Sequence, residues 1–151
     1  MDYRKEKITD NLAYMLAQAH RSVHLKLEKQ LRLEGVQVEH WRILEVLSDE
    51  KGRSMGDLAE IVLMNHPALT KMLDKMVANG LAHRSLDPQD QRKVLVFITN
   101  SGLELYQRLN THAVKFHNQF VSNIGQEKLS HLKQLLTEVI DETSLSSSNA
   151  P

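Results

Sequence analysis

Residues 53–98 read RSMGDLAEIVLMNHPALTKMLDKMVANGLAHRSLDPQDQRKVLVFI, and this segment decides the fold. Its first half predicts two short helices joined by a tight link at 63–65, because apolar residues recur at intervals of three and four on both sides of that link. Gly80 stops the second helix, since glycine readily adopts the left-handed conformation that follows a helix end. Two β-forming runs, 81–86 and 94–98, then flank a polar turn that contains Asp and Pro. Two crossed helices followed by a β-hairpin predict a winged helix-turn-helix.

The second helix of this unit is expected to begin at Asn65 or His66. Asn65 is a favourable N-cap, and Pro67 suits the first turn, where its missing N–H costs nothing. One apolar stripe should face the core: Leu69, Met72, Leu73, Met76 and Val77. The outward face carries short or polar side chains near the first turns: His66, Ala68, Thr70, Lys71 and Asp74. Such a face is what a helix needs when its N-terminal end enters the major groove of DNA.

Three pieces of the chain resemble the multiple-antibiotic-resistance regulator (MarR) family of bacterial transcription factors. They are HWRILEVL (40–47), DLAEIVLMNHPALTKMLDKMVANGLAHR (57–84) and DPQDQRKVLVFITNSG (87–102), in this order and at this spacing. The resemblance implies a mainly α fold with a small β wing (α+β), in which a winged helix-turn-helix head spans 36–100. It also implies a homodimer that represses transcription at a pseudo-palindromic operator and leaves the DNA when a small effector binds.

Long helices are expected on both sides of the head, at 8–33 and 101–143, followed by a flexible tail at 144–151. Their apolar stripes are too wide for one small head to cover, and exposed apolar patches of that size mark association. A second copy of the chain is the expected partner, and a two-fold dimer would present two reading helices to successive major grooves. The resemblance implies the same interlocked arrangement.

Composition sets further limits. With 151 residues the chain can bury one core, so a single domain over 1–151 is expected. Lys+Arg and Asp+Glu both number 19, so the formal net charge is zero and does not by itself indicate a nucleic-acid partner. The absence of cysteine excludes disulfides, thiolate catalysis and cysteine-ligated zinc. We find neither a signal peptide nor an apolar segment of about 20 residues, which predicts a cytoplasmic protein with no membrane partner.

The residues expected to contact double-stranded DNA lie on the second helix and the hairpin: His66, Pro67, Ala68, Thr70, Lys71, Lys75, Arg84, Gln91, Arg92 and Lys93. Thr70 can meet a thymine methyl or a phosphate, and Lys71 a guanine edge or a phosphate. The alternative for Lys71 is an ordinary solvated lysine. His66 and Pro67 occupy the first turn, where the helix dipole draws phosphate, although simple capping explains them equally well.

The hairpin tip carries a second candidate contact. Arg92 stands where the family pattern Asp-x-Arg-Asp-x-Arg has its last arginine, so it can enter the minor groove, whose negative potential attracts arginine. Alternatively it pairs with Asp87 or Asp90 and stiffens the hairpin. The sequence departs from the family pattern at Gln89, where arginine is frequent, and Lys93 can supply the missing charge.

The resemblance further implies a cleft for a small aromatic or phenolic effector between the head and the long helices. The residues expected to line it are Met15, His20, His40, Trp41 and Arg42, although Met15 and Trp41 also fit ordinary packing roles. His20 and His24 stand four apart, a spacing that can grip a metal, and some relatives sense metals. A metal-responsive regulator therefore stays an alternative, but no ligand set can be assembled, and no metal or other cofactor is assigned.

Two other classes of function were weighed. An enzyme would need a nucleophile or an acid/base set, and the sequence has no Gly-rich phosphate loop, no Gly-x-Ser-x-Gly and no His-Glu-x-x-His. We therefore expect no enzymatic activity. A winged helix used only for protein–protein contact is the remaining alternative, and salt-dependent binding to duplex DNA separates it from a regulator.

Overall fold

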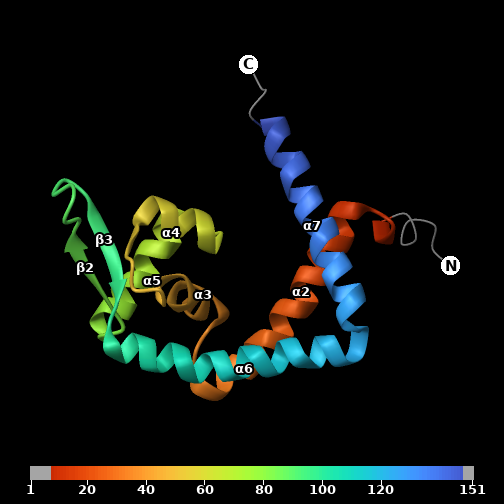
Figure 1. Cartoon of the computed structure of the whole chain (residues 1–151), viewed down its shortest axis with the longest axis horizontal. Helices are drawn as coiled ribbons and strands as arrows, with labels where there is room; N and C mark the ends of the chain where they lie inside the picture. Colours follow the sequence, from red (N-terminus) through yellow and green to blue (C-terminus); the bar gives the residue numbers. More distant parts are fainter. Residues whose placement is uncertain (1–7, 148–151) are drawn as a thin grey trace. The chain divides into compact units, whose positions relative to one another are not determined.

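The computed structural model describes residues 8–147. In chain order the elements are α2 (Leu12–Leu31), the 3₁₀ turn η1 (Arg32–Glu34), α3 (Val38–Leu47), β1 (Arg53–Ser54), α4 (Met55–Val62), α5 (His66–Ala78), β2 (Ala82–Leu86), β3 (Val94–Ile98), α6 (Asn100–Ile124) and α7 (Gln126–Ser147) (Figure 1). The chain divides into two compact units, the first ending at Ala113 and the second beginning at Val114. The mainly α fold with a small sheet is confirmed.

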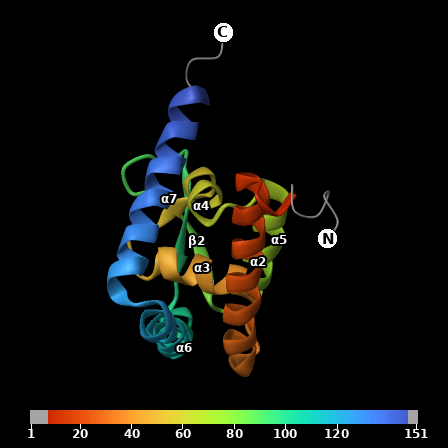
Figure 2. The same ribbon diagram turned by 90° about the vertical axis from the view of Figure 1, so that its right-hand side faces the viewer.

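The first unit contains the winged head, in which α3, α4 and α5 pack together beside the hairpin (Figure 1 and Figure 2). Its antiparallel sheet has the order β1-β3-β2, so β3 lies in the middle. The hairpin register pairs Arg84 with Val96 and Leu86 with Val94. The sequence did not predict β1, because a two-residue strand is too short to show any periodicity.

The core of the head is built from leucines on the inward faces of its helices. Leu69, Leu73 and Met76 of α5 are fully buried, as the helical spacing predicted, whereas Met72 and Val77 at the edges of that stripe are only partly buried. The side chains that complete the core come from the other elements of this unit: Leu31, Val38, Ile43, Leu44, Leu47, Leu58, Val96 and Leu109. The helix α5 is therefore anchored to the core by its inward face.

Several helix ends differ from the expected ones. The helix α2 begins at Leu12 rather than near Ile8, because the Asn11 side chain accepts a hydrogen bond from the Tyr14 N–H at 3.2 Å and caps it. The last helix continues past Glu142 to Ser147, since no Gly or Pro interrupts this stretch. Residues 144–147, expected as tail, are therefore helical, and the rest of the expected tail lies outside the described residues.

The second unit consists of the end of α6 and the whole of α7. Gly125 separates the two helices with a φ of +97°, as its position in the sequence predicted. Phe116 and Phe120 meet edge to face within α6, and Leu129 of α7 is buried. Over residues 8–147, no helix combines the length and apolarity needed to cross a bilayer.

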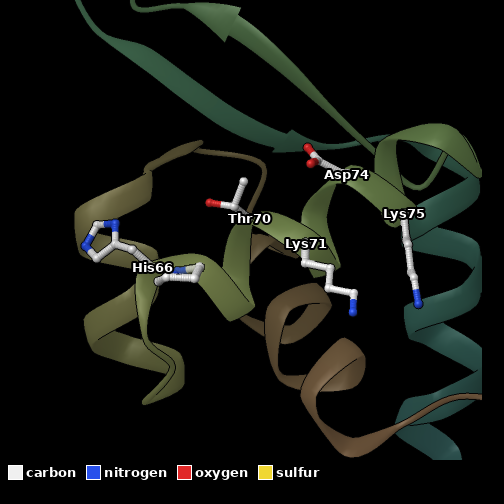
Figure 3. A pocket seen from close by; sticks show the side chains of 6 residues that line it. His66, Thr70, Lys71, Asp74 and Lys75 are labelled. Carbon is white, nitrogen blue, oxygen red and sulfur yellow. The ribbon is translucent and has the colours of Figure 1, made fainter.

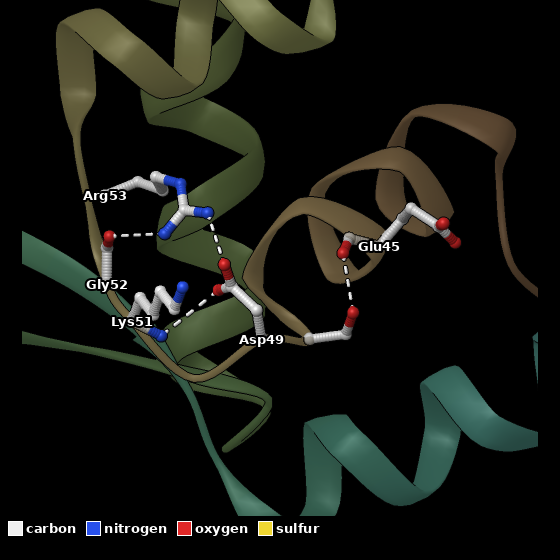
Figure 4. A network of polar contacts seen from close by, with 6 residues as sticks. Glu45, Asp49, Lys51, Gly52 and Arg53 are labelled. Carbon is white, nitrogen blue, oxygen red and sulfur yellow. Dashed lines mark hydrogen bonds and ion pairs between the residues drawn. The ribbon is translucent and has the colours of Figure 1, made fainter.

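A polar network fixes the strand β1 against the end of α3 (Figure 4). The Arg53 guanidinium donates to the Asp49 carboxylate at 2.6 Å and to the Gly52 carbonyl at 2.8 Å. The hydrogen bond from Arg53, supported by one from the Lys51 N–H, lowers the pKa of Asp49 below its ordinary value. This contribution to stability is present above the unfolded pKa of Asp49 and is lost as the pH falls through its folded pKa.

Candidate DNA-binding surface

The helix α5 is capped as the sequence predicted. The Asn65 side chain accepts a hydrogen bond from the Ala68 N–H at 2.9 Å, and Pro67 stands in the first turn. The helix ends at Ala78, and Gly80 follows with a φ of +69°. The N-terminal end of α5 is thus well defined and carries no acidic residue in its first turn, which leaves its positive dipole available to an anion.

The outer face of α5 is hollowed into a shallow groove, called here the α5 groove, lined by His66, Pro67, Thr70, Lys71, Asp74 and Lys75 (Figure 3). In this view Asp74 points toward the strands of the hairpin, whereas Lys71 and Lys75 extend in the opposite direction. Five of the residues expected to contact DNA therefore lie together on one exposed surface. The groove also contains Asp74, which the sequence placed on this face without assigning it a role.

Arg84 reaches this surface from β2 and is held there. Its Nη2 donates to Oδ1 of Asp74 at 2.7 Å, so an ion pair joins the hairpin to α5. Sequence reasoning did not find this pair, because the partners lie ten positions apart on two different elements. The pairing neutralises a charge that was expected to face DNA.

The hairpin tip is stiffened by its two aspartates. The Asp87 carboxylate accepts from the Gln89 N–H at 2.9 Å, and the Asp90 carboxylate accepts from the Arg92 N–H at 3.1 Å. Arg92 Nε also lies 3.3 Å from Asp90, yet its side chain remains 93% exposed. The stiffening contact weighed for Arg92 is thus present, and its charge still stands at the surface. Gln91 and Lys93 beside it are exposed as well.

The residues expected to line an effector cleft do not all come together. His40 lines a cleft of about 250 Å³ between the start of α3 and α5, called here the His40 cleft, together with Gln37, Met64, Ala68, Lys71, Met72 and Lys75. Met15 and His20 lie exposed on α2, and Trp41 and Arg42 are partly buried on α3 without lining this cleft. Sequence spacing could not place Lys71 or Lys75 beside His40, because the cleft arises from packing between helices.

The His40 cleft is electrostatically positive. Burial lowers the pKa of the His40 imidazole below its ordinary value, and the Lys75 ammonium adds to this, while the Glu39 carboxylate acts in the opposite direction. Lys71 and Lys75 line both this cleft and the α5 groove. An anion in the cleft would therefore share two cations with an anion in the groove.

The histidine pair of α2 meets α3 through His24. The rings of His20 and His24 lie 5.5 Å apart, and His24 Nε2 lies 3.8 Å from Oε1 of Glu39. Within the part of the chain that the structure describes, no three His, Cys, Asp or Glu side chains are grouped to hold a metal ion. The contact between His24 and Glu39 joins α2 to α3.

Comparison with known proteins agrees with this geometry. A sequence model of the MarR family matches residues 34–93. The homoprotocatechuate degradative operon repressor of Escherichia coli is 29% identical over 131 residues, which cover 87% of this chain and 88% of the relative. Among solved structures, NadR in complex with 4-hydroxyphenylacetate is 26% identical with a TM-score of 0.75, covering 85% of this chain and 92% of NadR. A variant of Escherichia coli MarR bound to operator DNA shares the fold, with a TM-score of 0.78 at 22% identity and coverage of 92% and 99%.

The fold, the exposed helix α5 and these relatives define a winged helix-turn-helix transcriptional regulator. Residues 34–93 match the sequence model of the MarR family, the family that the three pieces at 40–47, 57–84 and 87–102 resemble.

Proposed function

We propose that this regulator is a repressor that binds a pseudo-palindromic operator as a homodimer and is released by a small aromatic or phenolic anion. The observation that carries the proposal is the α5 groove, where Thr70, Lys71 and Lys75 stand exposed on a capped helix beside an arginine-tipped wing. A repressor is favoured because the relative from Escherichia coli is named as one, and because a dimer bound across an operator blocks polymerase.

Each element of the surface has a role in this proposal. The N-terminal half of α5 enters the major groove, where Thr70 and Lys71 contact base edges and Lys75 contacts a phosphate. His66 and Pro67 bring the positive end of the helix dipole to the backbone. Arg92 enters the adjacent minor groove. The remaining expected contacts, which are to the backbone or to a thymine methyl, come from Ala68, Arg84, Gln91 and Lys93.

Large apolar side chains that are exposed to solvent on α2 and α7 support a homodimer. On α2, Leu12 is 60% exposed and Met15 is 52% exposed, which is unusual for large apolar residues unless a partner covers them. On α7, Leu132, Leu135 and Ile140 are exposed in the same way. A second copy of the chain is the partner that would cover them. If the two α5 helices of such a two-fold dimer lie about 34 Å apart, they meet successive major grooves on one face of the duplex.

The His40 cleft supports release by an aromatic anion. It is lined by apolar Met64 and Met72 as well as by His40, Lys71 and Lys75, so it offers an aromatic ring packing surface and a carboxylate cationic partners. NadR was solved with 4-hydroxyphenylacetate, and the relative from Escherichia coli is named for homoprotocatechuate. An anion in the cleft that engages the two lysines favours a state in which they no longer meet phosphate.

Titration of the operator complex with 4-hydroxyphenylacetate, homoprotocatechuate and uncharged phenol tests the proposal. Both carboxylates are expected to release the duplex, while phenol should not, because it has no charge to engage the lysines. The variant His40→Leu should bind the operator normally but require a roughly tenfold higher carboxylate concentration for release, since the hydrogen bond that the imidazole N–H donates to the carboxylate is lost. Fluorescence anisotropy of a labelled duplex provides the measurement. A release curve that is the same for His40→Leu and the native chain would contradict the placement of the effector in this cleft.

A further inference from the structure

A carboxylate stands in the middle of the surface that faces DNA. Asp74 lines the α5 groove together with Thr70, Lys71 and Lys75, and its side chain is 61% exposed (Figure 3). Packing therefore does not explain it. A carboxylate on such a face is repelled by every phosphate that approaches, so it lowers affinity for duplex DNA unless it gains a partner there.

The partner that Asp74 has in the unbound chain is Arg84. The pair joins Oδ1 to Nη2 at 2.7 Å, and the Arg84 side chain is 34% exposed. Exposed pairs of this kind contribute little to stability, so either member can exchange its partner for another of similar charge or hydrogen-bonding character. Arg84 lies midway along β2, so we expect a guanidinium released from Asp74 to reach a phosphate of the bound duplex.

Asp74 also has the chemistry to read a base. It lies one helical turn after Thr70 on the face expected in the major groove, and a carboxylate there accepts a hydrogen bond from the N4 amino group of cytosine. Cytosine offers that donor with no acceptor of its own beside it, whereas adenine sets its N6 donor next to the N7 acceptor, which repels a carboxylate. Guanine and thymine present acceptors at the corresponding positions. A carboxylate is therefore favoured at cytosine over the other three bases.

We propose that Asp74 is a specificity-determining residue that exchanges Arg84 for a cytosine amino group when the operator is bound. On a duplex of arbitrary sequence the carboxylate stays paired with Arg84 and keeps that arginine from a phosphate. On the operator, cytosine takes the carboxylate and frees Arg84 for the backbone. Specificity then has two sources: the operator is favoured by the contact of Asp74 with cytosine, and other sequences are disfavoured because Arg84 stays paired with Asp74. This inference rests on the proposed DNA-binding surface.

The variant Asp74→Asn tests the exchange against an operator and a scrambled duplex of the same length. Affinity for the scrambled duplex is expected to rise roughly three- to tenfold, with a steeper salt dependence, because Arg84 gains a phosphate contact. Affinity for the operator should not rise in parallel, so the ratio of the two affinities falls about tenfold or more. Selection of duplexes by Asp74→Asn should also lose one cytosine preference in each half-site.

Two further variants make the test specific. The rise in affinity for the scrambled duplex that Asp74→Asn causes should disappear when Arg84 is also replaced by alanine, since the rise depends on the Arg84 guanidinium. The variant Asp141→Asn removes the same charge from α7 and should leave both affinities unchanged. An equal gain on both duplexes, a gain that persists in Arg84→Ala, or no change at all would overturn the inference. Failure of the native chain to prefer any duplex would instead overturn the proposed function.

Discussion

Replacement of Gly102 by alanine is expected to destabilise the protein by about 3 kcal/mol, at the upper end of the usual range for overpacking. Gly102 lies in the first turn of α6 and is buried against the segment that follows α5. A Cβ atom there would lie 2.1 Å from the Leu81 carbonyl oxygen and 2.8 Å from Cγ1 of Ile98. The first of these contacts is with backbone, which cannot rotate away as a side chain can.

The surrounding hydrogen bonds prevent a simple shift of the helix. The Thr99 hydroxyl donates to the Gly80 carbonyl at 2.5 Å and accepts from the Gly102 N–H at 3.0 Å. The Leu81 carbonyl in turn accepts from the Thr99 N–H. Moving α6 away from Leu81 would break these contacts, which tie the start of α6 to the end of α5. The orientation of α5 depends on these same hydrogen bonds.

The measurement is thermal unfolding followed by circular dichroism, in which Gly102→Ala should lower the midpoint by roughly 6–12 °C. Gly56 provides a matched control, because it also lies in the first turn of a helix and a Cβ there would meet nothing within 4 Å. Gly56→Ala should therefore stabilise the fold by about 0.5 kcal/mol. Equal effects of the two substitutions would show that the close approach to Leu81 does not limit this position.

Removal of Lys71 or Arg92 is expected to produce the largest loss of DNA binding. Lys71→Ala should weaken operator binding by about 1–3 kcal/mol if the lysine contacts a guanine edge, and should reduce the salt slope by about one if it contacts a phosphate. Arg92→Ala should cause a loss of similar size, largest for operators with a narrow, A·T-rich minor groove. Both side chains are exposed, so neither change should alter stability by more than about 0.5 kcal/mol.

Anisotropy titrations at several salt concentrations measure these effects. The two losses should add in Lys71→Ala/Arg92→Ala, since the residues lie on separate elements and share no partner among the described residues. Lys128→Ala serves as the control, because it removes the same charge from α7. If Lys71→Ala and Lys128→Ala bind the operator alike, the assignment of the α5 groove as the reading surface is wrong.

Sequence reasoning succeeded where structure is encoded locally. The Asn65 cap, the Gly80 stop and the inward stripe of α5 follow from residues within a few positions of each other, and all three are present. The end of α7 was placed too early because serines near a terminus resemble a tail, although nothing in that stretch breaks a helix. The role of Gly102 was invisible, because its reason is a carbonyl at Leu81 that packing alone brings near.

The candidate site shows the same division. The outward residues of α5 could be named from helical periodicity, whereas the Arg84 partner and the His40 cleft could not. Both depend on how separate elements pack: β2 against α5 in one case, and the start of α3 against α5 in the other. Asp74 and Arg84, for which the sequence predicted no mutual contact, are therefore paired in the structure.

Selection of bound duplexes from a random pool by the native chain tests the central claim most directly. We expect recovery of an inverted repeat whose half-site centres lie about 10–10.5 base pairs apart, with one half-site for each of the two copies of α5. Recovery of no common sequence, or of a single unrepeated half-site, would contradict a homodimer that binds DNA through two copies of α5.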